Sequence, residues 1–187
     1  MKVFFKTFIT LNLVMLLIAC DSKKEERKAL KDELIQLEME LDSTYAYLLS
    51  NKIDTLSEIQ LSISSVILRI KNNLHTEKVD TVLSKKLDRY KVVGKDIGQN
   101  QRVFLKTKRA YLEEKTHLSN LNHDLENGLT ELELFTEYIV FEKNKVDQIK
   151  ELTLSFVREK NRQIEIYTSL HNELNPLSLQ LLKVNEK

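Results

Sequence analysis

The chain has 187 residues, of which 42% are hydrophobic and 30% are charged, and its formal net charge is +1. Three glycines and one proline are too few for the frequent turns of a β-sandwich, a barrel or a doubly wound sheet. The apolar content is too high for a disordered chain, so the composition predicts one domain built from long helices.

The N-terminus begins with a short basic stretch and continues as an apolar run from Thr7 to Ala19. A membrane-spanning helix needs about 20 apolar residues, so this shorter run indicates the apolar core of a signal peptide. The run ends in Leu17-Ile18-Ala19-Cys20, which resembles the lipobox of bacterial lipoproteins. The resemblance implies that residues 1–19 are a signal peptide and that Cys20 receives the lipid.

Cys20 is the only cysteine of the chain, so an intramolecular disulfide is impossible. Bacterial lipidation attaches more than one acyl chain, palmitate among them, and two or more chains anchor a protein stably. We therefore expect a chain anchored to a membrane through Cys20 rather than spanning it, with residues 20–23 as a tether.

The resemblance places the chain in the bacterial cell envelope, although it does not identify the leaflet. Asp21 is similar to the inner-membrane retention signal of enteric bacteria. The low alanine content, with many Lys, Asn, Ile and Leu residues, is similar in style to helical surface lipoproteins of spirochaetes. We therefore favour the outer membrane or the cell surface over the inner membrane.

From Lys24 onward, apolar residues recur at alternating spacings of three and four, which is typical of helices with a coiled-coil-like seam. The pattern predicts helical segments over residues 24–74, 77–126 and 130–174. It weakens at residues 50–54, where either a kink or a full reversal of the chain fits. The first segment carries two runs of seam residues: Leu30, Leu34, Leu37, Leu41 and Leu48, then Leu56, Ile59, Ile63, Val66 and Ile70.

Several residues predict where the helices begin and end. Asn127-Gly128 is the clearest stop signal, and Asn175-Pro176 ends the last helix, leaving residues 175–187 as a C-terminal tail. Gly94 and Gly98 have the spacing of close helix contacts, but in this chain we interpret them as a kink or break. Capping boxes, and one N-cap at Thr76, predict helix starts. The boxes begin at Ser22, Thr55 and Thr130.

Three segments of nearly equal length, joined by short turns, predict an all-α fold: an elongated, antiparallel, coiled-coil-like helical bundle over residues 24–174. The alternative is a compact bundle of five or six shorter helices. Its additional breaks would lie near Asn51, Gly98 and Lys160-Asn161.

Charge is arranged in blocks. Residues 85–109 carry a local charge of +7, whereas residues 25–42, 113–126 and 131–142 carry −4, −3 and −4. Antiparallel folding would bring the three acidic blocks to the anchored end of the bundle. The simpler interpretation is that each block is a solvated helix face.

Few residues suggest a metal-binding, catalytic or nucleic-acid-binding site. Glu114-x-x-His117 has the spacing of di-iron helical bundles, but no second Glu-x-x-His follows, so the sequence predicts no metal site. The Gly-x-Ser-x-Gly and P-loop patterns are absent, which predicts no catalytic residues and no cofactor. Tyr90 and Phe104 of the basic block belong to the apolar stripe, so we do not expect nucleic-acid binding.

The sequence therefore predicts a lipoprotein that is not an enzyme and that acts as a helical protein-interaction module at the cell surface or in the periplasm. Its partners would be the membrane, through the lipid on Cys20, and an unidentified protein. Self-association is expected wherever part of the seam stays uncovered. The alternative is a structural or accessory factor of an envelope assembly for secretion, lysis or transport.

Overall fold

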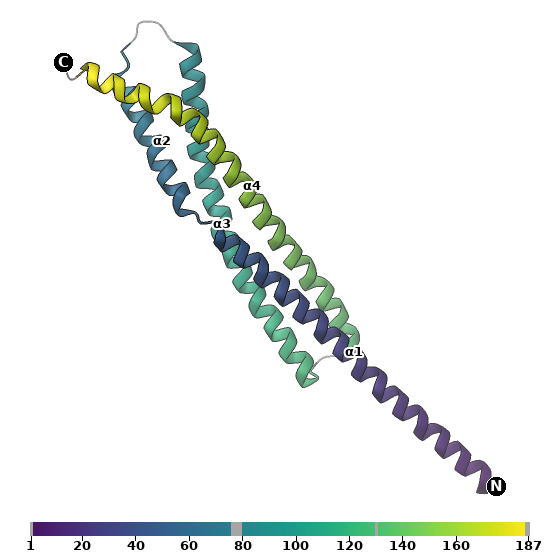
Figure 1. Cartoon of the computed structure of the whole chain (residues 1–187). Helices are drawn as coiled ribbons and strands as arrows, with labels where there is room; N and C mark the ends of the chain where they lie inside the picture. Colours follow the sequence, from purple (N-terminus) through teal and green to yellow (C-terminus); the bar gives the residue numbers. More distant parts are fainter. Residues whose placement is uncertain (1, 76–79, 130, 186–187) are drawn as a thin grey trace. The chain divides into compact units, whose positions relative to one another are not determined.

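The computed structural model describes residues 2–75, 80–129 and 131–185, and it describes side chains from residue 23 to residue 184 outside the two gaps. Over these residues the chain forms four α-helices and no strand, which confirms the all-α prediction (Figure 1). The helices have 49, 20, 47 and 54 residues, so the alternative of five or six shorter helices is wrong. They are α1 (Lys2–Ser50), α2 (Asp54–Asn73), α3 (Thr81–Asn127) and α4 (Leu132–Asn185).

The chain packs as two units. Unit 1 comprises Met1–Ser43 and Tyr111–Gln148, and unit 2 comprises Thr44–Ala110 and Ile149–Lys187. Helices α1, α3 and α4 are each divided between the two units, whereas α2 belongs wholly to unit 2.

In unit 1, α1 and α3 run antiparallel. Lys31 Nζ lies 2.5 Å from Glu126 Oε1, and eleven residues along each helix Lys115 Nζ lies 2.6 Å from Asp42 Oδ2. The three helices bury their seam residues against one another, as the spacing of three and four predicts. These residues are Leu30, Leu34, Leu37 and Leu41 of α1, Leu118, Leu121 and Leu125 of α3, and Phe135, Ile139 and Val146 of α4.

The predicted stop at Asn127-Gly128 is confirmed. Gly128 has a positive φ of 65°, which a residue without Cβ adopts at little cost. Its N–H donates to the Leu125 carbonyl, and the Leu129 N–H donates to the Asp124 carbonyl at 3.1 Å. These two bonds are those of a Schellman motif, which satisfies the last carbonyls of α3 and turns the chain toward α4.

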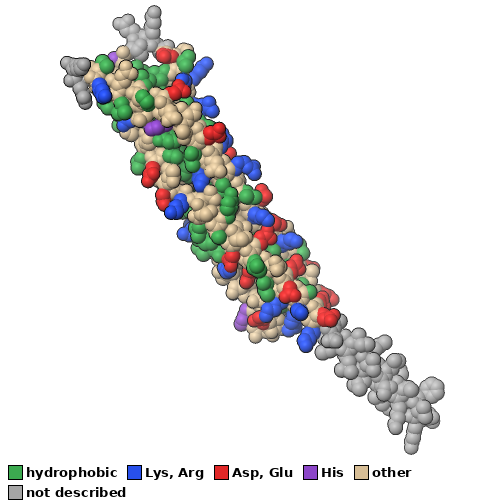
Figure 2. Space-filling model, viewed as in Figure 1, with side chains coloured by type: hydrophobic (Ala, Val, Ile, Leu, Met, Phe, Trp, Pro, Cys, Tyr) green, Lys and Arg blue, Asp and Glu red, His purple; other side chains and the backbone are tan. Residues whose placement is uncertain are grey.

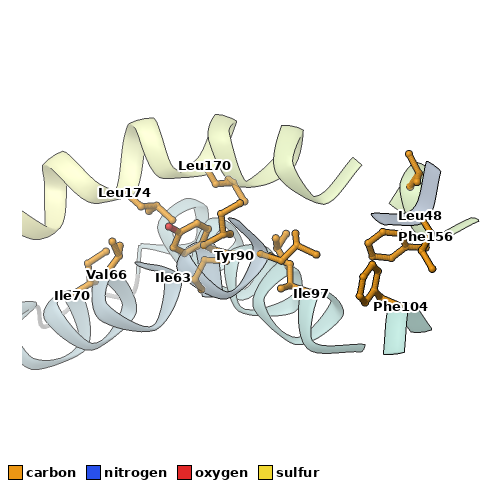
Figure 3. Close-up of a cluster of buried hydrophobic side chains, with 14 residues drawn as sticks. Leu48, Ile63, Val66, Ile70, Tyr90, Ile97, Phe104, Phe156, Leu170 and Leu174 are labelled. Carbon is orange, nitrogen blue, oxygen red and sulfur yellow. The ribbon is translucent and has the colours of Figure 1, made fainter. Parts of the chain in front are cut away.

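In unit 2, the core lies between α2, α3, α4 and the last turns of α1. Tyr90 and Phe156 are fully buried, and the ring centroids of Phe104 and Phe156 lie 5.3 Å apart. Figure 3 shows the Tyr90 ring of α3 between apolar side chains of α2 and of α4, with Leu48 beside the two phenylalanines. The seam residues predicted for residues 56–70 are all buried here.

The chain kinks rather than reverses at residues 51–53. Leu48 and Phe104 belong to one cluster, Gln101 Nε2 donates to Ser57 Oγ at 2.9 Å, and Gln60 Nε2 donates to the Gly94 carbonyl at 3.1 Å. The α1–α2 run therefore moves steadily along α3 in the opposite direction. Lys160 Nζ of α4 donates to Asn51 Oδ1 at 2.9 Å and so contacts the chain at the kink.

The seam explains why the chain breaks here without glycine or proline. After Leu48, spacings of three and four would place the next seam residues at 51, 55 and 58, but α2 buries Leu56 and Ile59. One residue too many lies between the two runs. In a continuous helix, this extra residue would rotate the apolar face of α2 by about 100° away from the core. The break lets that face point toward the core again.

Gly94 and Gly98 do not break α3, so their interpretation as a kink or break is wrong. Helix α3 continues through both residues, and a Cβ at Gly94 would lie 3.2 Å from Ile63 Cγ2 of α2. The missing side chain therefore lets α2 and α3 approach closely. At Gly98 the nearest atom to such a Cβ would be Gln60 Nε2, at 3.1 Å.

The predicted end of the last helix at Asn175-Pro176 is also wrong, because α4 continues to Asn185 and residues 175–185 are helical. Arg69 of α2 explains the continuation. Its Nη2 donates to Asn175 Oδ1 at 2.8 Å and its Nε donates to Ser178 Oγ at 3.1 Å. These bonds hold the chain on both sides of Pro176, and Figure 1 shows α4 changing direction near its yellow C-terminal end, as helices with an internal proline do.

None of the predicted helix starts that lie within the described residues is confirmed. Helix α2 begins at Asp54 with Ile53 as its N-cap and without a side-chain capping bond, so the start at Thr55 is wrong. Helix α1 is continuous through residues 22–25, so no helix begins at Ser22. Thr76 and Thr130 lie outside the described residues.

The three acidic blocks, residues 25–42, 113–126 and 131–142, all belong to unit 1, and the basic block, residues 85–109, belongs to unit 2. Figure 2 shows acidic and basic side chains interspersed with apolar ones on the visible face. No helix is apolar over a length that would cross a membrane, as far as the described residues go.

Candidate functional site

Two charged residues interrupt the apolar seam of unit 1. On α3, Glu114 takes the core position four residues before Leu118, and on α4, Glu142 takes the position four residues before Val146. Both therefore point toward the bundle interior by the same spacing that places their apolar neighbours there. Carboxylates at core positions are costly unless they are paired or protonated, which marks this layer as a candidate site.

Two more residues complete the cluster, which we name the Glu114–Glu142 cluster and which also contains His117 and Lys145. Lys145 Nζ lies 2.9 Å from Glu142 Oε2, 3.7 Å from Glu114 Oε2 and 3.1 Å from His117 Nδ1. His117 and Glu114, three residues apart on α3, bring Nδ1 and Oε2 within 4.0 Å. Two helices thus supply four converging polar side chains.

Burial falls from one side of the cluster to the other. The Glu114 side chain is 3% exposed and that of Glu142 is 13% exposed, whereas those of Lys145 and His117 are 28% and 51% exposed. Among the described residues, no donor reaches Oε1 of Glu114. The deepest group of the cluster therefore has an oxygen that lacks a donor.

The protonation of Glu114 follows from this burial. Desolvation, together with the neighbouring Glu142 carboxylate, raises the pKa of Glu114 to about 8, although the Lys145 ammonium acts in the opposite direction. Near neutral pH, Glu114 consequently holds a proton, while Glu142 pairs with Lys145. The cluster therefore holds a proton, and it offers two carboxyl groups and an imidazole to any cation that displaces this proton.

A second feature of unit 1 is an apolar stripe on the surface of α4, formed by Leu134, Tyr138 and Phe141. These side chains are 42%, 45% and 58% exposed, and their spacing of four and three places them on one helix face. Lys145 continues the face, with Nζ lying 4.5 Å from the Phe141 ring centroid. The stripe therefore adjoins the Glu114–Glu142 cluster.

The residues that the sequence analysis considered as sites lie in different parts of the structure. Cys20 lies in α1, but the structure does not describe its side chain. Glu114 and His117 do lie together, as their spacing predicts.

The sequence alone did not identify Glu142 and Lys145, because the spacing of di-iron bundles calls for a second Glu-x-x-His and not for a carboxylate on the facing helix. A signal was present, because the α4 seam has a gap between Ile139 and Val146 that residue 142 fills. The α3 seam has a corresponding gap at Glu114. Two charged residues in the gaps of neighbouring seams are the pattern that could have identified the pair.

Three comparisons, with protein-family models, with curated proteins and with solved structures, found no match to this chain.

Proposed function

We propose that this chain is a lipid-anchored helical interaction module, held to a bacterial membrane through Cys20 and binding another protein through the apolar stripe of α4. The anchor rests on the Leu17-Ile18-Ala19-Cys20 motif and the basic, apolar segment before it. The binding role rests on the stripe, because neighbouring large apolar side chains exposed on one face commonly mark a protein-interaction surface.

The chemistry around the stripe indicates the kind of partner. Glu133 and Glu137 lie on the first turns of α4, Glu131 directly precedes the helix, and all three are exposed. Residues 131–142 contain no basic residue. A matching partner presents an apolar helix face bordered by lysine or arginine, since such a helix packs against the stripe while its charges pair with the glutamates.

The anchor is tested by digesting intact cells with proteinase K, using wild type beside a Cys20→Ala variant. We expect wild type to be membrane-bound and digested on intact cells, and the variant to lose its membrane association. Protection of wild type until lysis would instead favour the accessory factor of an envelope assembly. A Cys20→Ala variant that stays as membrane-bound as wild type would contradict the anchor.

The stripe is tested with two labelled synthetic helices that share one leucine-rich face, one bordered by lysines and the other by glutamates. We expect the purified full chain to bind the basic helix, and Phe141→Ser to weaken binding at least about tenfold, as for an interface hot spot. The matched control is Leu105→Ser on α3, because Leu105 is 57% exposed and Phe141 is 58% exposed. Equal binding of both peptides, or equal losses in both variants, would count against the proposal.

A further inference from the structure

We propose that Glu114, His117 and Glu142 form a binding site for one divalent transition-metal cation of the zinc class. One oxygen of each carboxylate and one ring nitrogen of His117 lie within 4.8 Å of one another. Carboxylate oxygen and imidazole nitrogen are ligands that zinc and its neighbours in the first transition series accept. The proposal does not depend on the docking role of the stripe.

The arrangement of the three ligands fits such a cation. A metal about 2.1 Å from each ligand atom holds those atoms closer together than 4.8 Å, so the ligands must draw inward slightly. His117 is half-exposed, and its ring can turn toward the pair once the Lys145 ammonium has left its Nδ1. Glu114 and Glu142 are already fixed on neighbouring helices by the seam. Three protein ligands leave a coordination position for water, as in zinc sites that are not purely structural.

The unpartnered oxygen is the independent sign of a missing ligand. Glu114 is 97% buried, since only 3% of its side chain is exposed, and its Oε1 receives no hydrogen bond from the part of the chain that the structure describes. A buried polar atom without a partner normally costs stability and calls for an explanation, such as an unseen water or ion. A cation that displaces the Glu114 proton would satisfy this oxygen and would be held by both carboxylates.

Lys145 determines how a metal would enter. Its ammonium already lies within 4.0 Å of all three proposed ligands, so it acts as the cation of the cluster. The side chain is 28% exposed, and its Nζ lies 4.5 Å from the exposed Phe141 ring. Lys145 can therefore swing toward solvent when a doubly charged cation takes its place. Metal and ammonium compete for the same carboxylates.

The experiment uses the purified full chain in detergent, treated with chelator and then dialysed free of it. Titration with Zn²⁺ by calorimetry should show one site per chain, and the bound metal should raise the melting temperature. Mg²⁺ at the same concentration should bind far more weakly, because it prefers an all-oxygen octahedron. His117→Gln and Glu142→Gln should each weaken Zn²⁺ binding at least about tenfold, on the scale of losses at metal sites.

Two further variants separate the site from its surroundings. Lys145→Met removes the competing ammonium and should tighten Zn²⁺ binding, whereas Asp147→Asn alters an exposed carboxylate of the same helix outside the stripe and should leave it unchanged. Circular dichroism of each variant establishes that it is folded. Zinc binding that His117→Gln leaves intact would overturn the proposal. Binding found only in Lys145→Met would overturn it as well, because Lys145 would then be the permanent cation of the cluster.

Discussion

Glutamine in place of Glu114 should raise the free energy of unfolding at pH 8 by an amount on the order of 3 kcal/mol, measured by urea denaturation with a metal chelator present. The folded chain holds the Glu114 proton up to a pKa of about 8, compared with an ordinary value of 4.5. Keeping the carboxylate ionised at this core position therefore costs folding free energy, and the neutral amide removes that cost.

The direction of the pH dependence follows from the same shift. Between about pH 4.5 and pH 8 the folded state binds a proton that the unfolded state has released, so stability falls as the pH rises across this window. The wild type should therefore be less stable at pH 8 than at pH 5, and Glu114→Gln should show a much flatter profile. The charged neighbours in the cluster, Glu142 and Lys145, are retained in both proteins.

The control for this prediction is Glu137→Gln, which removes an exposed carboxylate from unit 1 without touching the cluster. Its unfolding free energy should follow the wild-type profile. Parallel profiles for wild type and Glu114→Gln from pH 5 to pH 8 would show that the Glu114 carboxylate is not buried in the way described.

Alanine in place of Phe156 should lower the free energy of unfolding by about 3–5 kcal/mol, the usual cost of emptying a phenylalanine site in a core. Phe156 is fully buried in unit 2, and its ring centroid lies 5.3 Å from that of Phe104. The loss combines the lost burial with a cavity that three packed helices cannot fill.

Phe141→Ala is the matched control, because it makes the same chemical change on the same helix at a side chain that is 58% exposed. Its effect on stability should stay within about 0.5 kcal/mol. Urea denaturation followed by circular dichroism gives both values. Similar losses in the two variants would mean that the stripe of α4 is part of the core and is not a free surface.

The sequence predicts the buried face of this fold well, because spacing alone determines which residues of a long helix share a face. All ten seam residues predicted over residues 30–70 are buried. The helix ends are harder to predict. Thr55 satisfies a capping pattern, yet α2 begins one residue earlier at Asp54, and Pro176 lies inside a helix that Arg69 holds from another element.

The Glu114–Glu142 cluster shows a different limit. Each half of the pair lies on its own helix, and neither half indicates chemistry alone: Glu114 with His117 is a common spacing, and Glu142 is one acid in an acidic block. Only the pairing of α3 with α4 brings the two carboxylates together. A cluster of this kind can be predicted when the seams of both helices are aligned, because each acid then occupies a core position.

The kink at residues 51–53 has a consequence for how such chains diverge. The helix breaks because the stretch between the seam of α1 and the seam of α2 is one residue longer than the spacing of three and four allows. In this chain, one residue more than the repeat accommodates separates two helices that a continuous seam would join. A change of one residue in the length of such a repeat is therefore a route by which a long helix can gain or lose a joint without glycine or proline.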